Sequence, residues 1–218
     1  PNQTFPLRLT IRREMTSGKS NLCAVNRRQP PLQIITKSMF DKGKYKLVTE
    51  NPYNKKQLSG LGLVICGEWD SSSVKIIQNN NVEHLFLNYT YGWRCSSYAF
   101  LAQIPPIKTL DIIDVHSVGI KSVERQHGLV ALSLNMPNAY DVDYSVFHNL
   151  RNVFCYGSKR NDTLFFCNSM ESLYIDDLKV GDKHRIGCLK KLKDLTIANS
   201  NLTSLSFVRN LALLESLT

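Results

Sequence analysis

The feature that most constrains the fold is a series of leucine-type residues that recurs along the last three quarters of the chain. In the closing stretch LKKLKDLTIANSNLTSLSFVRNLALLESLT (189–218), apolar residues follow an L-x-x-L-x-L pattern that restarts after 22 residues. This spacing does not fit one amphipathic helix, whose apolar positions fall at i, i+3, i+4 and i+7. A fixed period of about 20 to 29 residues around L-x-x-L-x-L indicates a solenoid of stacked repeats.

The same unit can be followed upstream. Its starts are Leu58, Val82, Ile107, Leu129, Leu150, Met170, Leu192 and Leu214, with steps of 24, 25, 22, 21, 20, 22 and 22 residues. Side chains alternate along a strand, so both leucines of L-x-L point to one face. A single repeat cannot bury that face alone, whereas stacked repeats share one continuous core.

These units resemble the leucine-rich repeat family, and the last ones specifically resemble the 22-residue class shared by bacterial internalins and protein-phosphatase regulatory subunits. The resemblance implies an α/β solenoid with a parallel concave sheet and an irregular or short-helical convex side. It covers residues 58–218 as about seven repeats, the last incomplete, so we expect either that the chain is a fragment of a longer protein or that its final strand pairs with another partner. The family's polar turn position reads Cys66, Thr90, Val115, Pro137, Ser158, Leu178 and Ser200, which predicts irregular turns.

Residues 1–57 do not follow the period and differ in charge. They contain 12 Lys and Arg against 3 acidic residues, whereas residues 58–218 contain 15 of each, so the formal charge of +9 belongs to the first quarter. Alternating stretches such as LRLTI (7–11) and KYKLV (44–48) predict edge strands. We expect a basic, β-rich N-terminal cap, or a small separate domain, because solenoid ends need a cover.

The family resemblance implies that partners bind to the concave face, at the x positions in and beside L-x-L. The central column is predicted to read Gly62, Phe86, Asp111, Ser133, Phe154, Tyr174 and Thr196. The candidate protein-binding residues are His84, Phe86, Asn88, Tyr89, Asp111, Asp114, Phe154, Tyr156, Tyr174 and Asp176. Aromatic residues are enriched at interfaces, although they also pack well on strands as plain sheet cover. The carboxylates are consistent with a partner that carries some positive charge, although scattered carboxylates more often serve only solubility.

A second hypothesis gives the basic segment a role of its own. Lys and Arg mixed with Tyr can contact phosphates and stack on bases. The candidate polyanion-binding residues are Arg8, Arg12, Arg13, Arg27, Arg28, Lys42, Lys44 and Lys46. The alternative function is therefore nucleic-acid or ribonucleoprotein binding through residues 1–57, with the repeats as a platform. The sequence contains no recognised nucleic-acid module, and basic segments also serve only to solvate a surface.

Motifs for catalysis or membrane insertion are missing from the sequence. The histidines show no metal-ligand spacing, and no HExxH, Walker or G-x-S-x-G motif occurs, so we expect no enzyme, cofactor or metal. The longest apolar runs are far shorter than the roughly 20 residues that a transmembrane helix needs. The six cysteines lack CxxC spacing, so a redox motif or a zinc ribbon has no support. Their even number leaves disulfides possible, whereas a cytosolic chain favours free buried thiols. We expect an intracellular location, cytoplasmic or nuclear, rather than an extracellular one.

Overall fold

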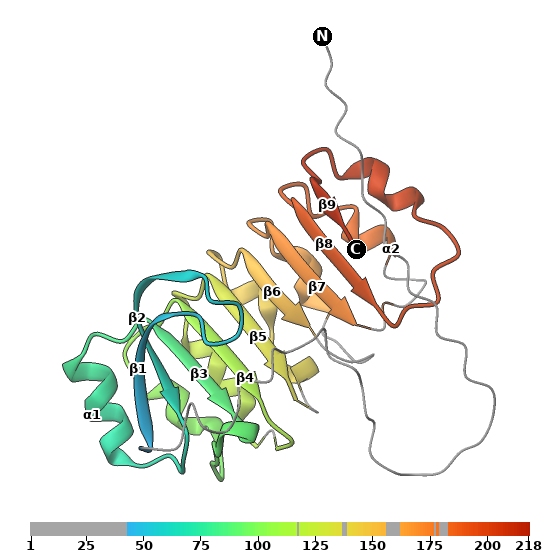
Figure 1. The fold of residues 1–218 in the computed structure, drawn as a ribbon. Coiled ribbons are helices and arrows are strands. Elements are labelled where there is room, and N and C mark those ends of the chain that lie inside the picture. The colour runs from blue at the N-terminus through green and yellow to red at the C-terminus, as the bar shows by residue number, and fades with distance from the viewer. Residues whose placement is uncertain (1–42, 117, 137–138, 156–161, 177, 179–182) are drawn as a thin grey trace.

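Nine strands form a single sheet in the computed structural model, which describes residues 43–116, 118–136, 139–155, 162–176, 178 and 183–218 (Figure 1). They lie side by side in chain order: β1 (Tyr45–Glu50), β2 (Gln57–Ile65), β3 (His84–Asn88), β4 (Thr109–Ile113), β5 (Ala131–Asn135), β6 (Asn152–Cys155), β7 (Ser172–Asp176), β8 (Asp194–Ala198) and β9 (Ser216–Leu217). β1 pairs antiparallel with β2, and every later pair is parallel. This topology confirms the predicted leucine-rich repeat solenoid.

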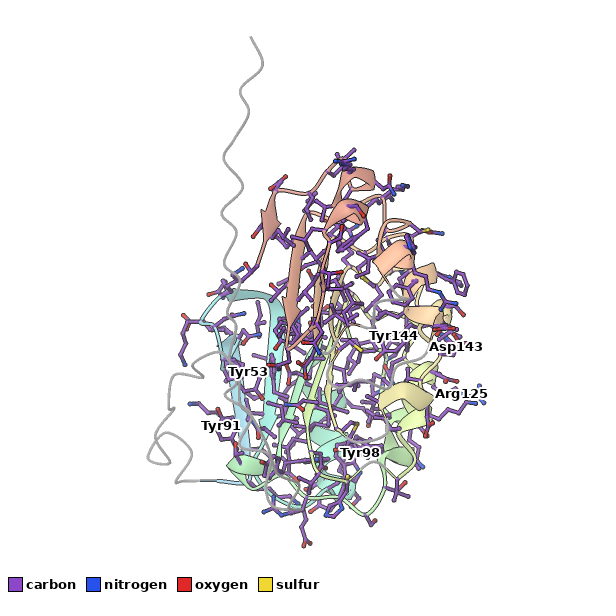
Figure 2. The ribbon with its side chains drawn as sticks, turned by 90° about the vertical axis from the view of Figure 1, so that its right-hand side faces the viewer. Tyr53, Tyr91, Tyr98, Arg125, Asp143 and Tyr144 are labelled. Carbon is purple, nitrogen blue, oxygen red and sulfur yellow. The ribbon has the colours of Figure 1, made fainter. Side chains whose placement is uncertain are left out.

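A helical segment lies in each connection between successive parallel strands. Among the described residues the α-helices are α1 (Ser71–Asn79) and α2 (Lys183–Ile186). The other connections contain 3₁₀ helices at Tyr98–Ala102, Ile120–Arg125, Tyr144–Val146, Asp162–Phe166 and Ser206–Asn210. Short 3₁₀ turns, Tyr89–Tyr91 and Ala139–Asp141, follow β3 and β5. Figure 2 shows these helical connections on one side of the sheet. The opposite side is called the concave face below.

Helix α1 shows how a convex segment is fixed locally. Asp70 is its N-cap and accepts hydrogen bonds from the backbone N–H groups of Ser72 and Ser73. The Ser73 hydroxyl oxygen in turn accepts a hydrogen bond from the Asp70 backbone N–H, which completes a capping box. These bonds satisfy N–H groups that have no partner within the helix.

The core is built from the two inward positions of each strand. The register aligns them in two rows, one of Leu63, Leu85, Leu110, Leu132, Val153, Leu173, Leu195 and Leu217, the other of Ile65, Leu87, Ile112, Leu134, Cys155, Ile175 and Ile197. All members except the partly buried Ile197 belong to the buried core. Each fully buried aliphatic side chain stabilises the fold by about 1.5 to 3 kcal/mol relative to exposure.

The sequence prediction for the first repeat is wrong by two residues. Gly62 was expected to align with Phe86, but Val64 occupies that position. The stretch LSGLGLVIC contains two overlapping L-x-L frames, and pairing with β1 continues as far as Ile65, which selects the later frame. A Cβ on Gly62 would come within 2.8 Å of the Val48 side chain, so the β1–β2 hairpin packs closely only because that atom is absent.

The described part of the N-terminal segment is continuous with the sheet. Strand β1 and the first residue of β2 belong to residues 1–57, and β1 pairs along most of β2. Residues 1–42 lie outside the described residues. Within the described part of the chain, no helix combines the length and the apolar character that crossing a membrane requires.

A charge placed in the inward row should unfold the carboxy-terminal repeats. Leu195 is 1% exposed, so Leu195→Asp buries an unpaired carboxylate and should lower the free energy of unfolding by about 3 kcal/mol or more. Urea unfolding measures the loss, and hydrogen exchange should locate it in β7 to β9. The control is Thr196→Asp, on the next residue and the opposite face. Equal effects of the two changes would contradict the assignment of the core face.

Candidate functional site

The concave face carries one aligned column of side chains. The register places Val64, Phe86, Asp111, Ser133, Phe154, Tyr174 and Thr196 opposite one another on successive strands. Apart from its first member, this is the central column predicted from the sequence. Val64 and Phe86 are buried, Phe154 is exposed, and Asp111, Ser133, Tyr174 and Thr196 are half-buried. We call the part of the face on β2 to β4 the covered half, because the turn before β2 lies over it, and the part on β5 to β8 the open half.

An aromatic pair dominates the open half. The rings of Phe154 and Tyr174 stack with their centroids 5.5 Å apart and their planes at 16°. Phe154 is 41% exposed. The neighbouring column contributes Asn152, Ser172 and Asp194, which are exposed or half-buried. The open half is therefore an aromatic surface bordered by small polar groups and one exposed carboxylate.

The turn between β1 and β2 covers the other half. Tyr53 of this turn packs edge-on against Phe86, with centroids 5.9 Å apart, and stacks on Tyr91 at 6.2 Å. Phe86 is 0% exposed as a result. Figure 2 shows Tyr53 and Tyr91 together on the concave side, while Tyr98 and Tyr144 lie on the side of the helical connections.

Two polar atoms in the covered half are buried without a hydrogen-bond partner, the Tyr53 hydroxyl and Asp111 Oδ1. Burial raises the pKa of Asp111 to about 7, and the neighbouring Ser133 hydroxyl offsets part of the rise. Burial, with a contribution from the Asp111 charge, also raises the pKa of Tyr53, and the nearby Asn88 side chain opposes this rise. An unpartnered buried polar group costs about 1 to 3 kcal/mol, so this arrangement lowers the stability of the fold.

His84 is also buried in the covered half. Its Nδ1 lies 2.8 Å from the Thr109 hydroxyl and its Nε2 lies 3.4 Å from the Ser59 hydroxyl. Burial lowers the pKa of His84, with the Glu83 charge acting in the opposite direction. In this arrangement the ring is paired within the protein and does not face a partner.

Three of the predicted binding side chains are buried at strand ends and stabilise local turns. Asn88 accepts hydrogen bonds from the Thr90 N–H and hydroxyl, at 2.9 and 2.8 Å. Asp114 accepts the Tyr98 hydroxyl at 2.5 Å and the Val115 N–H at 2.6 Å. Asp176 accepts the Asn199 side-chain amide at 2.6 Å. Their exposures are 3%, 7% and 2%.

The remaining predicted residues are distributed as follows. Tyr89 is 38% exposed at the end of β3, and Tyr156 lies outside the described residues. Of the basic candidates, Lys44 forms an ion pair with Asp70 and lies 5.2 Å from the centroid of the Tyr45 ring, and Lys46 is half-buried in β1. Arg8, Arg12, Arg13, Arg27, Arg28 and Lys42 lie outside the described residues.

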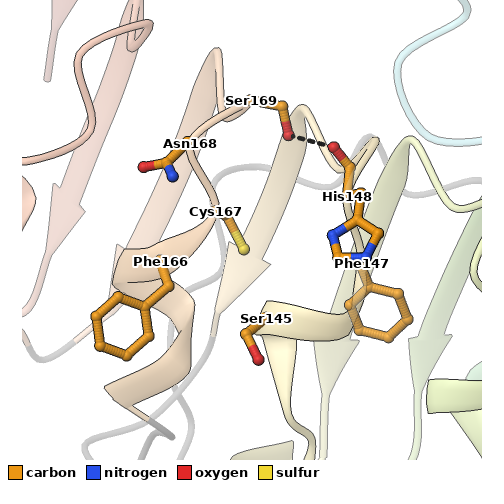
Figure 3. Close-up of a pocket in the computed structure, with 7 residues that line it drawn as sticks. All are labelled: Ser145, Phe147, His148, Phe166, Cys167, Asn168 and Ser169. Atoms are coloured by element: carbon orange, nitrogen blue, oxygen red, sulfur yellow. Dashed lines mark hydrogen bonds between the residues drawn. The ribbon is translucent and has the colours of Figure 1, made fainter.

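The convex side contains a small hollow of about 120 Å³ (Figure 3). Its lining residues are Ser145, Phe147, His148, Phe166, Cys167, Asn168 and Ser169. The Ser169 hydroxyl donates to the His148 and Leu150 carbonyls at 3.1 and 2.8 Å. The Cys167 thiol donates to the Tyr144 carbonyl at 3.3 Å, and burial raises the pKa of Cys167 to about 12. A neutral, hydrogen-bonded thiol is not an activated nucleophile.

Among the described residues, no group of three or more His, Cys, Asp or Glu side chains could hold a metal ion.

Comparisons with known proteins identify solved structures but no family model. No family model and no curated protein matches the chain. The chain is similar in structure to an internalin C2 from Listeria monocytogenes, at 16% identity and a TM-score of 0.47, over 64% of this chain and 71% of that one. It is also similar to a second internalin of that organism, at 16% identity and a TM-score of 0.41, over 66% and 49%. The fold assignment rests on the sheet topology and the repeat register described above.

Replacing Asp111 should change how stability depends on pH. Because the folded pKa of about 7 lies above the ordinary value of 3.8, the folded state binds the proton more tightly than the unfolded chain does. Asp111 therefore makes the free energy of unfolding fall as pH rises from about 4 to 7. Asp111→Asn should remove this fall and stabilise the protein by about 2 to 4 kcal/mol at pH 8.

Urea unfolding between pH 4 and 8 checks this expectation. Asp194→Asn, at an exposed position on the same face, should leave the wild-type curve unchanged. Parallel pH curves for the wild type and Asp111→Asn would show that Asp111 is solvated rather than enclosed.

Proposed function

We propose that this chain is a non-enzymatic module that binds a protein partner through the open half of the concave face. The observation that carries the proposal is the Phe154–Tyr174 stack, because it holds an aromatic side chain 41% exposed in the middle of a regular sheet. Covering such a ring removes apolar surface from water, at about 25 cal/mol per Å². Aromatic side chains are enriched at protein interfaces for this reason.

The packing beneath the rings favours binding over simple sheet cover. Strands β6 and β7 are already buried on their other face through Val153, Cys155, Leu173 and Ile175, each no more than 2% exposed. The two rings contact each other on the opposite side of the backbone. They are therefore not needed to close the core, and their exposed surface is available to a partner.

Other parts of the functional hypothesis stay proposals. One of them is the finer resemblance of the repeats to the 22-residue class of internalins and phosphatase regulatory subunits. Another is nucleic-acid binding through residues 1–57. Of the basic residues predicted to bind a polyanion, Lys44 and Lys46 lie in the part of the chain that the structure describes, and Lys44 forms an ion pair with Asp70. The intracellular location stays a proposal that fits the described cysteines, since none of them forms a disulfide: Cys66, Cys95, Cys155, Cys167 and Cys188.

Removing both rings should abolish partner binding without unfolding the protein. Phe154→Ala with Tyr174→Ala should remove the contact surface, while thermal unfolding shifts by only a few degrees because the inward rows are unchanged. The measurement compares the proteins retained from native extract by wild-type and double-variant columns, with mass spectrometry of what is bound.

The matched control is Phe166→Ala, which removes a 66% exposed ring from the convex side. It should retain every partner of the wild type. Partners that bind equally well to the double variant would place the binding surface elsewhere, and a large loss of stability would mean that the stacked rings are structural.

A further inference from the structure

The covered half of the concave face encloses hydrogen-bonding groups that the fold leaves unused. The Tyr53 hydroxyl and Asp111 Oδ1 are buried and have no hydrogen-bond partner. Asp111 lies beside Phe86 in the register, and Tyr53 packs on Phe86 and on Tyr91. A carboxylate bordered by aromatic rings has the composition that attracts an organic cation.

No neighbouring positive charge acts on the pKa of the Asp111 carboxyl group. Two causes set its pKa, burial and the Ser133 hydroxyl, and no basic side chain of the described chain contributes. Lys46 lies opposite Val64 on β1 and brings a positive charge to the edge of this region, where it opposes the rise in the pKa of Cys66. The other titratable groups that share the region are Tyr53, Tyr91, Cys66 and His84. Burial raises the pKa of Tyr53, Tyr91 and Cys66 and lowers that of His84. All four are therefore uncharged near pH 7, and Asp111 is the group of this region that titrates there.

We propose that Tyr53 is a displaceable plug over a guanidinium-binding site formed by Asp111, Phe86 and Tyr91, and that the site takes an arginine side chain of the protein partner. This inference rests on the proposed function, because it names the partner chemistry for the same face. A guanidinium is planar, stacks on aromatic rings and donates to carboxylates with little desolvation cost. It would supply the donor that Asp111 Oδ1 lacks.

Hydrogen bonds within the turn that carries Tyr53 hold its shape. Its hydrogen bonds are local: the Asn51 side chain accepts the Tyr53 and Asn54 N–H groups at 2.9 and 3.3 Å, and the Asn51 N–H donates to the Lys56 carbonyl at 2.8 Å. The ring of Tyr53 contacts the rings of Phe86 and Tyr91, and its hydroxyl lies near the Asn88 side chain at the end of β3. Lifting the turn therefore breaks ring packing, keeps its internal bonds, and frees two unsatisfied polar groups to find partners.

The closing experiment titrates the full, isotope-labelled chain with Nα-acetyl-L-arginine amide and follows the backbone amide resonances of β3 to β5 by NMR. The neutral isostere Nα-acetyl-L-citrulline amide is the control ligand at equal ionic strength. Arginine amide should give saturable shifts near Asp111, and citrulline amide should not. Affinity should fall about tenfold from pH 8 to pH 6, because a carboxyl with a pKa of about 7 loses most of its charge over that range.

Three variants separate the plug from the site. Asp111→Asn keeps the size of the side chain and should abolish binding at both pH values. Tyr53→Ala removes the competing ring and should raise the affinity at least about threefold, because the open state is then populated without the ligand. Tyr53→Phe keeps the ring but removes the unpartnered hydroxyl, so it should stabilise the closed turn and weaken binding.

Equal binding of citrulline amide, undiminished binding by Asp111→Asn, or weaker binding by Tyr53→Ala would each overturn the inference. Phe166→Ala, which changes an exposed ring on the convex side, should bind arginine amide like the wild type. If partner capture proves independent of Phe154 and Tyr174, the proposed function fails while this titration is unaffected. If arginine amide does not bind, only the inference about Asp111 fails.

Discussion

The structure depends on the burial of two inward apolar side chains from each of the strands β2 to β8, and one from β9, between the sheet and the helical connections. No repeat can bury its own pair, because each side chain is covered by the strands and connections before and after it. This requirement fixes the register between neighbouring strands, since a slip of one residue would turn the inward pair outward. The outward residues are then aligned as well, so the stacking of Phe154 on Tyr174 follows from the alignment of Val153 with Leu173.

Charged side chains repeat this register at the edge where the parallel strands begin. Glu83 pairs with Lys108, and Glu171 pairs with both Arg151 and Lys193. Backbone hydrogen bonds join the same positions, because the Glu171 carbonyl accepts hydrogen bonds from the N–H groups of Lys193 and Asp194. These ion pairs are largely exposed and contribute little stability. Their alternation of sign nevertheless disfavours slipped pairings that would place like charges together.

The sequence predicts the positions that recur in every repeat, and it misses contacts that are made by individual turns and connections. Leucine spacing located the inward rows from β3 onward, because burial selects apolar residues at fixed intervals. It misplaced the first repeat, where LSGLGLVIC offers two frames and only pairing with β1 decides between them.

The concave residues were harder to assign, because a polar residue in the x column looks the same whether it faces water or a partner within the fold. Asp114 was predicted to face a partner, yet it binds the Tyr98 hydroxyl from a connection 16 residues earlier. Phe86 was placed correctly in the column, but its cover by Tyr53 comes from a non-periodic turn whose path no repeat pattern encodes. The sequence did carry one usable signal, the glycine at 62, which marks a close approach of the hairpin.

The two halves of the concave face differ in what their side chains contribute to folding. In the open half, the hydroxyl groups and rings of the column lower the stability of the fold little, because they remain partly hydrated. In the covered half, the column places a carboxylate under a hairpin turn, where Val64 two strands earlier shows that an aliphatic side chain is readily accommodated. Folding gains nothing from ionising Asp111 there, since its pKa is raised by burial and its Oδ1 has no donor. A group that lowers stability in the closed structure is better explained by a second state, in which the turn is lifted and the carboxylate meets a positive charge.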